Sequence, residues 1–207
     1  PTSPFSGGSL LGDRVRMNKY MWDDRVFIRS MGSHGDLGGL ARKSQEVGDL
    51  LEASGKDFII FETVGVGQGE IDIASTADIT VVVLVPESGD EIQLMKAGLI
   101  EIADIFVINK SDRKGANKLA SLLKNILHYF SKNIKKEPEV FNVTSTKGEG
   151  IVELFIGIKK LIDLMDKKGI LEEKRFTRIK DRVKNNISEH LENQFWTDNK
   201  NNKFEKI

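Results

Sequence analysis

The sequence predicts an α/β fold in which amphipathic helices connect the short strands of a mostly parallel sheet. Residues 58–61 (Phe-Ile-Ile-Phe) and 105–108 (Ile-Phe-Val-Ile) are entirely apolar, which is typical of strands buried on both faces. Each run ends in a polar or glycine-rich loop. In open α/β sheets ligands bind at the carboxyl ends of the strands, so these two loops are the candidate ligand site.

The first predicted strand covers residues 26–28 and leads into a glycine-rich loop, residues 29–39. This loop lacks the G-x-x-x-x-G-K-[ST] spacing of a Walker A phosphate loop, because arginine rather than glycine precedes Lys43. Apolar residues then recur at helical spacing over residues 37–55, which predicts a helix before the strand of residues 58–61.

Beyond this point the predicted strands and helices continue to alternate. Residues 80–85 are rich in β-branched side chains and predict a buried strand, and residues 140–143 predict a last one. Helices are expected over residues 90–98, 119–130 and 151–165, where apolar side chains recur at helical spacing or acids open the first turn.

From Glu172 the composition changes to a strongly charged helix with a narrow apolar stripe. The stripe consists of Phe176, Ile179, Val183, Ile187 and Leu191. A stripe this narrow is typical of a seam against another helix, so we expect a packing or dimerising arm, with a nucleic-acid contact as the alternative. We expect a main domain over 1–168, the arm over 169–195 and a disordered tail over 196–207.

Composition excludes several classes of protein. The 31 basic and 31 acidic side chains balance, so no overall charge favours nucleic acid or an anionic membrane. There is no cysteine, which excludes disulfides and thiolate metal sites. No apolar run reaches the roughly 18 residues of a membrane-spanning helix. We expect a cytoplasmic protein, or one of the mitochondrial matrix in a eukaryote.

Glu62 ends the strand of residues 58–61 and stands three residues before Gly65. A carboxylate in this position can hold a Mg²⁺-bound water while the glycine N–H faces a terminal phosphate. The roles of two other residues stay open. Gln68 either orients a water or faces solvent, and Asp13 is either directed at a metal or a solvated loop acid.

Residues 109–112 read Asn-Lys-Ser-Asp, the N-K-x-D pattern of guanine-nucleotide-binding proteins. Asp112 can accept hydrogen bonds from the guanine N1–H and exocyclic amino groups, which adenine does not offer in that arrangement. Asn109 can bond the base edge or tie loops together, and the Lys110 stem can cover the ring. Backbone N–H groups of residues 144–150 can support the guanine oxygen, although a plain strand-to-helix turn looks similar. With Glu62, this pattern makes a GTPase the leading interpretation.

The chain resembles P-loop GTPases of the metallochaperone group, specifically the ArgK/MeaB type that accompanies methylmalonyl-CoA mutase. The resemblance extends from Pro1 to about Leu171. It rests on residues 4–8 (Pro-Phe-Ser-Gly-Gly), 11–14 (Leu-Gly-Asp-Arg), 28–31 (Ile-Arg-Ser-Met), 37–41 (Leu-Gly-Gly-Leu-Ala), 62–68 (Glu-Thr-Val-Gly-Val-Gly-Gln), 89–93 (Gly-Asp-Glu-Ile-Gln) and 109–112. It implies a three-layer P-loop NTPase fold that binds GTP or GDP with Mg²⁺.

The resemblance also implies residue roles. Asp13 would belong to the first switch and reach Mg²⁺, Glu62 would be the Walker-B-like carboxylate, and Gly65 would sense the γ-phosphate. Guanine would be bound by Asn109, Lys110, Asp112, Ser145 and Thr146, the last standing where alanine is usual. A further switch, which communicates the nucleotide state to the mutase, would include Asp90, Glu91, Gln93 and Lys96.

The Walker A loop and its strand are absent from these 207 residues, and in the family they lie upstream of the segment equivalent to Pro1. We therefore expect a fragment that hydrolyses little GTP by itself, because phosphoryl transfer depends on that loop. The function expected of the parent is GTP hydrolysis that gates cobalamin loading and protection of methylmalonyl-CoA mutase, with homodimerisation through the arm. Alternatives are a related GTPase for nickel or cobalt insertion, or a non-catalytic module that only binds a partner.

Overall fold

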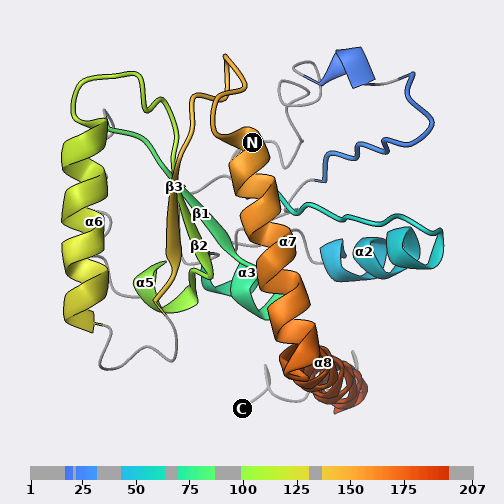
Figure 1. The fold of residues 1–207 in the computed structure, drawn as a ribbon. Helices are drawn as coiled ribbons and strands as arrows, with labels where there is room; N and C mark the ends of the chain where they lie inside the picture. Colours follow the sequence, from blue (N-terminus) through green and yellow to red (C-terminus); the bar gives the residue numbers. More distant parts are fainter. Residues whose placement is uncertain are drawn as a thin grey trace, which may run out of the picture. The chain divides into compact units, whose positions relative to one another are not determined.

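The computed structural model describes residues 17–20, 22–31, 43–63, 70–86, 99–130 and 137–195. Figure 1 shows the elements in chain order. They are the 3₁₀ helix η1 (Asn18–Tyr20), α2 (Ser44–Ala53), α3 (Glu70–Thr76), β1 (Val81–Leu84), α5 (Leu99–Ile102), β2 (Ile105–Ile108), α6 (Ala116–Phe130), β3 (Glu139–Asn142), α7 (Ile151–Lys167) and α8 (Ile170–Phe195).

The three strands form one parallel sheet in the order β1-β2-β3. Val81 pairs with Ile105, and Ile105 pairs with Glu139, so the strands begin level with one another and also end level. All four residues of the central strand β2 are buried, which explains its uninterrupted apolar sequence. The predicted parallel α/β architecture is confirmed.

Helix α6 covers one face of the sheet. Its buried leucines recur at helical spacing and pack against Phe106 and Ile108. These two residues of β2 are two positions apart, so their side chains point to the same face of the sheet. The complete buried cluster is Leu84, Ala103, Phe106, Ile108, Ala116, Leu119, Ala120, Leu123 and Leu127. Fully burying one such leucine, isoleucine or phenylalanine contributes about 1.5–3 kcal/mol, so this cluster is the main stabilising core of the sheet.

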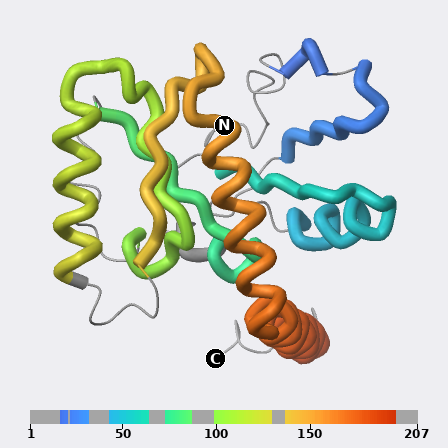
Figure 2. Tube along the Cα trace, in the orientation of Figure 1, coloured from blue at the N-terminus to red at the C-terminus, as the bar shows by residue number. Residues whose placement is uncertain are grey.

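Helix α7 begins on the other face of the sheet. Phe141 in β3 lies one residue out of phase with Val140, which packs against the α6 cluster. Its ring approaches Gly157 of α7 so closely that a Cβ at Gly157 would overlap it. Helices therefore cover both faces, as Figures 1 and 2 show, and the predicted three-layer arrangement is confirmed.

The predicted strands over residues 26–28 and 58–61 are wrong. Both segments lack regular secondary structure, and Ile60 is 90% exposed. Phe61 instead packs against Gly48 of α2, and the Phe58 ring lies 5.6 Å from that of Phe155. A parallel strand is held by ladder hydrogen bonds to a neighbour, and in the described residues β1 is an edge strand with no strand beside residues 58–61.

The helices after β2 lie close to their predicted bounds. Helix α6 starts three residues before the predicted 119, and α7 extends two residues beyond the predicted 165. Helix α2 is shorter than the predicted helix over residues 37–55, whose first part lies outside the described residues. The predicted helix over residues 90–98 also lies outside them, as does the tail over residues 196–207.

The chain divides into two compact units, residues 1–158 and 159–207. In the second unit Met165 and Leu171 are buried, and α8 runs as one helix of 26 residues. Gly169, with a φ angle of +68°, separates α7 from α8. The proposed division of the chain at residue 168 stays a prediction. Of the helices described, none is long and apolar enough to cross a membrane.

Candidate functional site

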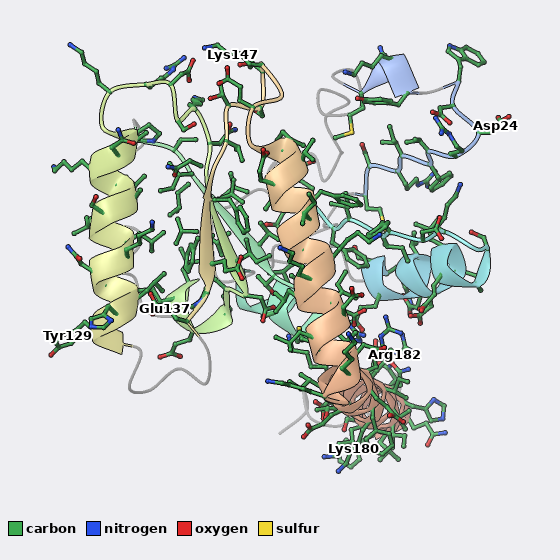
Figure 3. All side chains as sticks on the ribbon, viewed as in Figure 1. Asp24, Tyr129, Glu137, Lys147, Lys180 and Arg182 are labelled. Atoms are coloured by element: carbon green, nitrogen blue, oxygen red, sulfur yellow. The ribbon has the colours of Figure 1, made fainter. Side chains whose placement is uncertain are left out.

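Two polar loops meet at the carboxyl edge of the sheet. Because β2 and β3 are parallel and Ile108 pairs with Asn142, the loop at residues 109–112 lies beside the loop at residues 143–150. In Figure 3 Lys147 marks this edge, and Glu137, which precedes β3, marks the opposite end of that strand. The register of the strands therefore brings together the guanine-binding residues that the sequence predicts.

Asn109 ties the two loops together. Its backbone N–H donates to the carbonyl of Leu84 at 2.8 Å. Its side-chain Oδ1 accepts hydrogen bonds from the N–H of Lys110 at 2.8 Å and from the N–H of Ser145 at 3.2 Å. Tying loops is one of the two roles considered for Asn109, and its contact with a base stays a prediction.

Lys110 makes the sharp turn that directs the loop toward its neighbour. Its φ angle is +56°, a left-handed conformation that is uncommon for a residue other than glycine. The next residue, Ser111, donates its N–H to the carbonyl of Val143 at 3.0 Å, and the Arg113 N–H returns to the carbonyl of Lys110. Such a conformation persists where the surrounding contacts hold it, and it is frequent at binding sites.

Asp112 forms an exposed ion pair with the neighbouring loop. Oδ2 lies 3.2 Å from the Nζ of Lys147, and the two side chains are 38% and 54% exposed, respectively. An ion pair this exposed contributes little to stability, so a ligand can compete for the carboxylate. Lys147 was not predicted as a site residue, although its place one residue after Thr146 would have justified it.

The hydroxyl groups of Ser111 and Thr144 form a third link between the loops. Their oxygen atoms are 3.2 Å apart, and Thr144 is buried, with 2% of its surface exposed. Sequence reasoning missed both residues. Ser111 occupies the variable position of N-K-x-D, and Thr144 is separated from it by 33 residues, so no local pattern indicates the pair.

The loop after β3 uses most of its own N–H groups. The Thr144 N–H donates to the carbonyl of Glu149, and the Lys147 N–H to that of Thr144. The Gly148 N–H donates to the carbonyl of Ser145, whose own N–H is bonded to Asn109. Across residues 144–148, Thr146 alone has a backbone N–H with no partner in the part of the chain that the structure describes. Within residues 144–148 the Thr146 N–H is therefore the backbone donor left for a ligand, on the loop whose Lys147 pairs with Asp112.

The other predicted site residues are not brought into this group. Glu62 is exposed, and within the described ranges no hydrogen bond or ion pair joins it to the loop at residues 109–112 or to that at residues 143–150. The remaining predicted residues, Asp13, Gly65, Asp90, Glu91, Gln93 and Lys96, lie outside the described residues.

Magnesium is the metal ion that the prediction implies. No group of three or more histidine, aspartate or glutamate side chains suited to a metal occurs in the residues that the structure describes. Of the two carboxylates predicted for Mg²⁺, Glu62 is described and Asp13 is not. The exposed carboxylate of Glu62 is a hard oxygen donor, which suits Mg²⁺ together with waters and phosphate oxygens.

Two other features lie outside the loops at residues 109–112 and 143–150. An open, mostly apolar pocket of about 390 Å³ lies between residues 24–27 and α2. On the exposed turn nearby, a side-chain hydrogen bond from Arg25 lowers the pKa of Asp23 to about 2. This shift has a local cause two residues away, so it is no evidence for a catalytic group.

Comparison with known proteins shows the family to which the chain belongs. A family model described as the methylmalonyl Co-A mutase-associated GTPase MeaB matches residues 1–200. The chain belongs to the MeaB family of GTPases. That family is, by its description, associated with methylmalonyl-CoA mutase. The suspected ArgK/MeaB resemblance is therefore confirmed.

Individual relatives of this MeaB-family chain include a Pyrococcus abyssi protein, 45% identical over 100% of the chain and 65% of that protein. The mitochondrial methylmalonic aciduria type A homolog of Mus musculus is 38% identical, over 95% of the chain and 48% of that protein. The GTPase ArgK of Escherichia coli is 35% identical, over 84% and 54%, respectively. The chain thus spans between about half and two thirds of the length of these relatives.

A crystal structure of an LAO/AO transport system kinase has a similar fold. It superposes with a TM-score of 0.63 at 24% sequence identity, over 80% of this chain and 54% of that one. At this level of identity the likeness concerns the fold alone.

Proposed function

We propose that this chain is the guanine-reading part of a GTPase that gates cobalamin loading and protection of methylmalonyl-CoA mutase. The observation that carries the guanine assignment is that the Asp112 carboxylate and the N–H of Thr146, which has no partner among the described residues, stand on two loops hydrogen-bonded to each other. The mutase role is supported by the description of the family and by the methylmalonic aciduria type A relative.

The two groups match the edge of guanine. Guanine offers two donors, N1–H and the exocyclic amino group, next to one acceptor, O6. A carboxylate accepts from both donors, and a backbone N–H donates to the acceptor. Adenine presents a bare N1 and an amino group at the same positions, so it would face acceptor with acceptor and donor with donor. Leaving such groups unpaired costs about 1–3 kcal/mol each, which favours guanine.

The phosphate and magnesium part of the site involves residues outside the two loops. Asp13 and Glu62 would hold Mg²⁺ or its waters, and Gly65 would approach the γ-phosphate. Bound Mg²⁺ supplies charge neutralisation on the phosphate oxygens during transfer. We further propose that these 207 residues alone hydrolyse little GTP, because they contain no Walker A loop to hold the phosphates.

Nucleotide state would reach the partner through a separate switch. This switch comprises Asp90, Glu91, Gln93 and Lys96, which follow β1 as the N-K-x-D loop follows β2. Because loops after adjacent parallel strands open at the same edge, a change at the phosphates can be relayed to a partner from there. The partner would be a cobalamin-dependent mutase in the cytoplasm or, in a eukaryote, in the mitochondrial matrix.

The first test is binding of a fluorescent GDP analogue to this chain and to an extended form, meaning the same chain lengthened upstream to include the Walker A segment. We expect the extended form to bind the analogue, unlabelled GTP to displace it and ATP to leave it bound. The short chain should bind much more weakly, because it lacks the phosphate cradle.

The competitors and the two chain lengths distinguish the possible failures. Displacement by ATP as well as GTP would remove the guanine assignment of Asp112. If neither form binds the analogue, the GTPase proposal is wrong, and a non-catalytic partner-binding module becomes the better interpretation.

Helix α8 is proposed as the dimerisation arm. Within its own unit the stripe of Phe176, Ile179, Val183, Ile187 and Leu191 is 50–68% exposed. The stripe continues at Phe195, which is 52% exposed. A run of this kind on one helix face would be buried by the same face of a second copy, which is the self-complementary contact of a twofold dimer.

We expect Val183→Glu with Ile187→Glu to convert the dimer to a monomer while α8 stays helical, because a seam cannot accept two unpaired carboxylates. Asn185→Glu is the matched control, since residue 185 lies on the opposite side of the helix from Val183. The mass in solution, measured by light scattering over a range of concentrations, decides the matter. A dimer that withstands the paired change as well as the control would contradict this proposal.

A further inference from the structure

We propose that Ser111 and Thr144 are positioning residues whose hydroxyl pair sets the spacing between the Asp112 carboxylate and the Thr146 N–H, and thereby the preference for guanine over bases that lack its amino group. This inference rests on the proposed nucleotide-binding function. It concerns two residues that would not touch the base, and it assigns part of the specificity to the contact between the loops.

The pair is a part-buried link between the loops. Ser111 Oγ and Thr144 Oγ1 are 3.2 Å apart, and Thr144 is 2% exposed. Because Thr144 is buried, its hydroxyl has little access to water as a replacement partner when the Ser111 hydroxyl is removed. Either hydroxyl can be the donor in this hydrogen bond, and the other is then the acceptor.

Sequence neighbours connect this pair directly to the base-reading groups. Ser111 immediately precedes Asp112, and Thr144 stands two residues before Thr146. A backbone hydrogen bond from Ser111 to the Val143 carbonyl, 3.0 Å long, adds a second link at the same point. A shift between Ser111 and Thr144 is therefore passed to Asp112 and Thr146 with few rotatable bonds between.

The loop needs such a link because its conformation is strained. Lys110, next to Ser111, has a φ angle of +56°. A left-handed residue other than glycine holds that conformation only where its surroundings over-determine it. The other two side-chain links, from Asn109 to the Ser145 N–H and from Asp112 to Lys147, are exposed, and the base itself would compete for the second. The hydroxyl pair, which includes the buried Thr144, is therefore the better fixed point.

The test compares affinities for GDP and IDP in the extended form. The two nucleotides share N1–H and O6, but IDP lacks the amino group. The dissociation constant of IDP divided by that of GDP therefore reports how well the second oxygen of Asp112 is placed to accept from that group. We expect Ser111→Ala and Thr144→Val each to lower this ratio about fivefold, the size of one hydrogen bond. The double variant should lose no more than either single one, because both changes remove the same bond.

Matched controls separate positioning from general loss of structure. Thr144→Ser keeps a hydroxyl at the same point and should restore most of the ratio. Ser121→Ala and Thr177→Val remove exposed hydroxyls elsewhere and should leave it unchanged. Thermal unfolding of each variant, without nucleotide, shows whether the fold is retained.

The outcomes distinguish this inference from the function on which it rests. If GDP and IDP affinities fall by the same factor in Ser111→Ala, the pair is merely structural and the inference is overturned. An unchanged ratio in a folded Thr144→Val would overturn it as well. If the unaltered extended form binds no GDP, the proposed function fails first, and this inference fails with it.

Discussion

Replacing Asp112 with asparagine is expected to exchange the base preference from guanine to xanthine. A carboxylate offers two acceptors, whereas an asparagine amide offers one acceptor and one donor. Xanthine keeps the N1–H of guanine but carries a carbonyl in place of the amino group, so its pattern matches the amide. The affinity for GDP should fall at least about 100-fold, because one donor of guanine would face the donor of the amide.

The exchange is measured by competition of GTP and XTP against a fluorescent GDP or XDP analogue in the extended form. XTP should gain affinity where GTP loses it, a crossing that a damaged site would not produce. Asp163→Asn, which removes an exposed carboxylate from α7, is the control and should change neither affinity. If Asp112→Asn loses GTP without gaining XTP, Asp112 does not read the base edge.

Gly150→Ala is expected to be strongly destabilising, and Gly148→Ala only mildly so. Both glycines have left-handed φ angles, +76° and +74°, so either alanine is strained by about 1–2 kcal/mol. At Gly150 the new Cβ would also overlap the carbonyl oxygen of Asn142 and press on Val143, whereas nothing lies within 4 Å at Gly148. Crowding of this kind adds about 1–3 kcal/mol.

Urea unfolding of the two variants in the extended form checks this expectation, because the backbone strain is shared and cancels in the comparison. The midpoint for Gly150→Ala should lie well below that for Gly148→Ala. The guanine loop after β3 should weaken with it, since Gly150 closes the turn between that loop and α7. Equal losses in the two variants would mean that the close approach at Asn142 does not constrain the loop.

Much of the core could be read from local pattern. The strand predicted at residues 105–108 has the bounds of β2, and the leucines of α6 recur at the spacing that buries them together. The N-K-x-D sequence also identified its loop correctly, because a parallel strand that ends in a buried apolar residue must be followed by a turn at the sheet edge. Each of these features depends on neighbours within a few residues.

Residues 58–61 show where local pattern fails. Their composition is that of a buried strand, yet Ile60 is 90% exposed and the segment has no ladder partner in the described residues. A strand is stabilised by hydrogen bonds to another strand, so its sequence predicts only the capacity to pair. The position of Glu62, which follows this segment, therefore also depends on whether residues 58–61 pair with another strand.

By itself, the sequence determined which residues could recognise guanine and on which two loops they stand. Tertiary structure decided how those loops share their hydrogen bonds. It assigns the Asn109 side chain and the Ser145 N–H to each other, pairs Ser111 with Thr144, and leaves the Thr146 N–H without a partner among the described residues. These hydrogen bonds join the loops after β2 and β3, which are about 35 residues apart in the sequence. Only the parallel register of the two strands makes the loops neighbours.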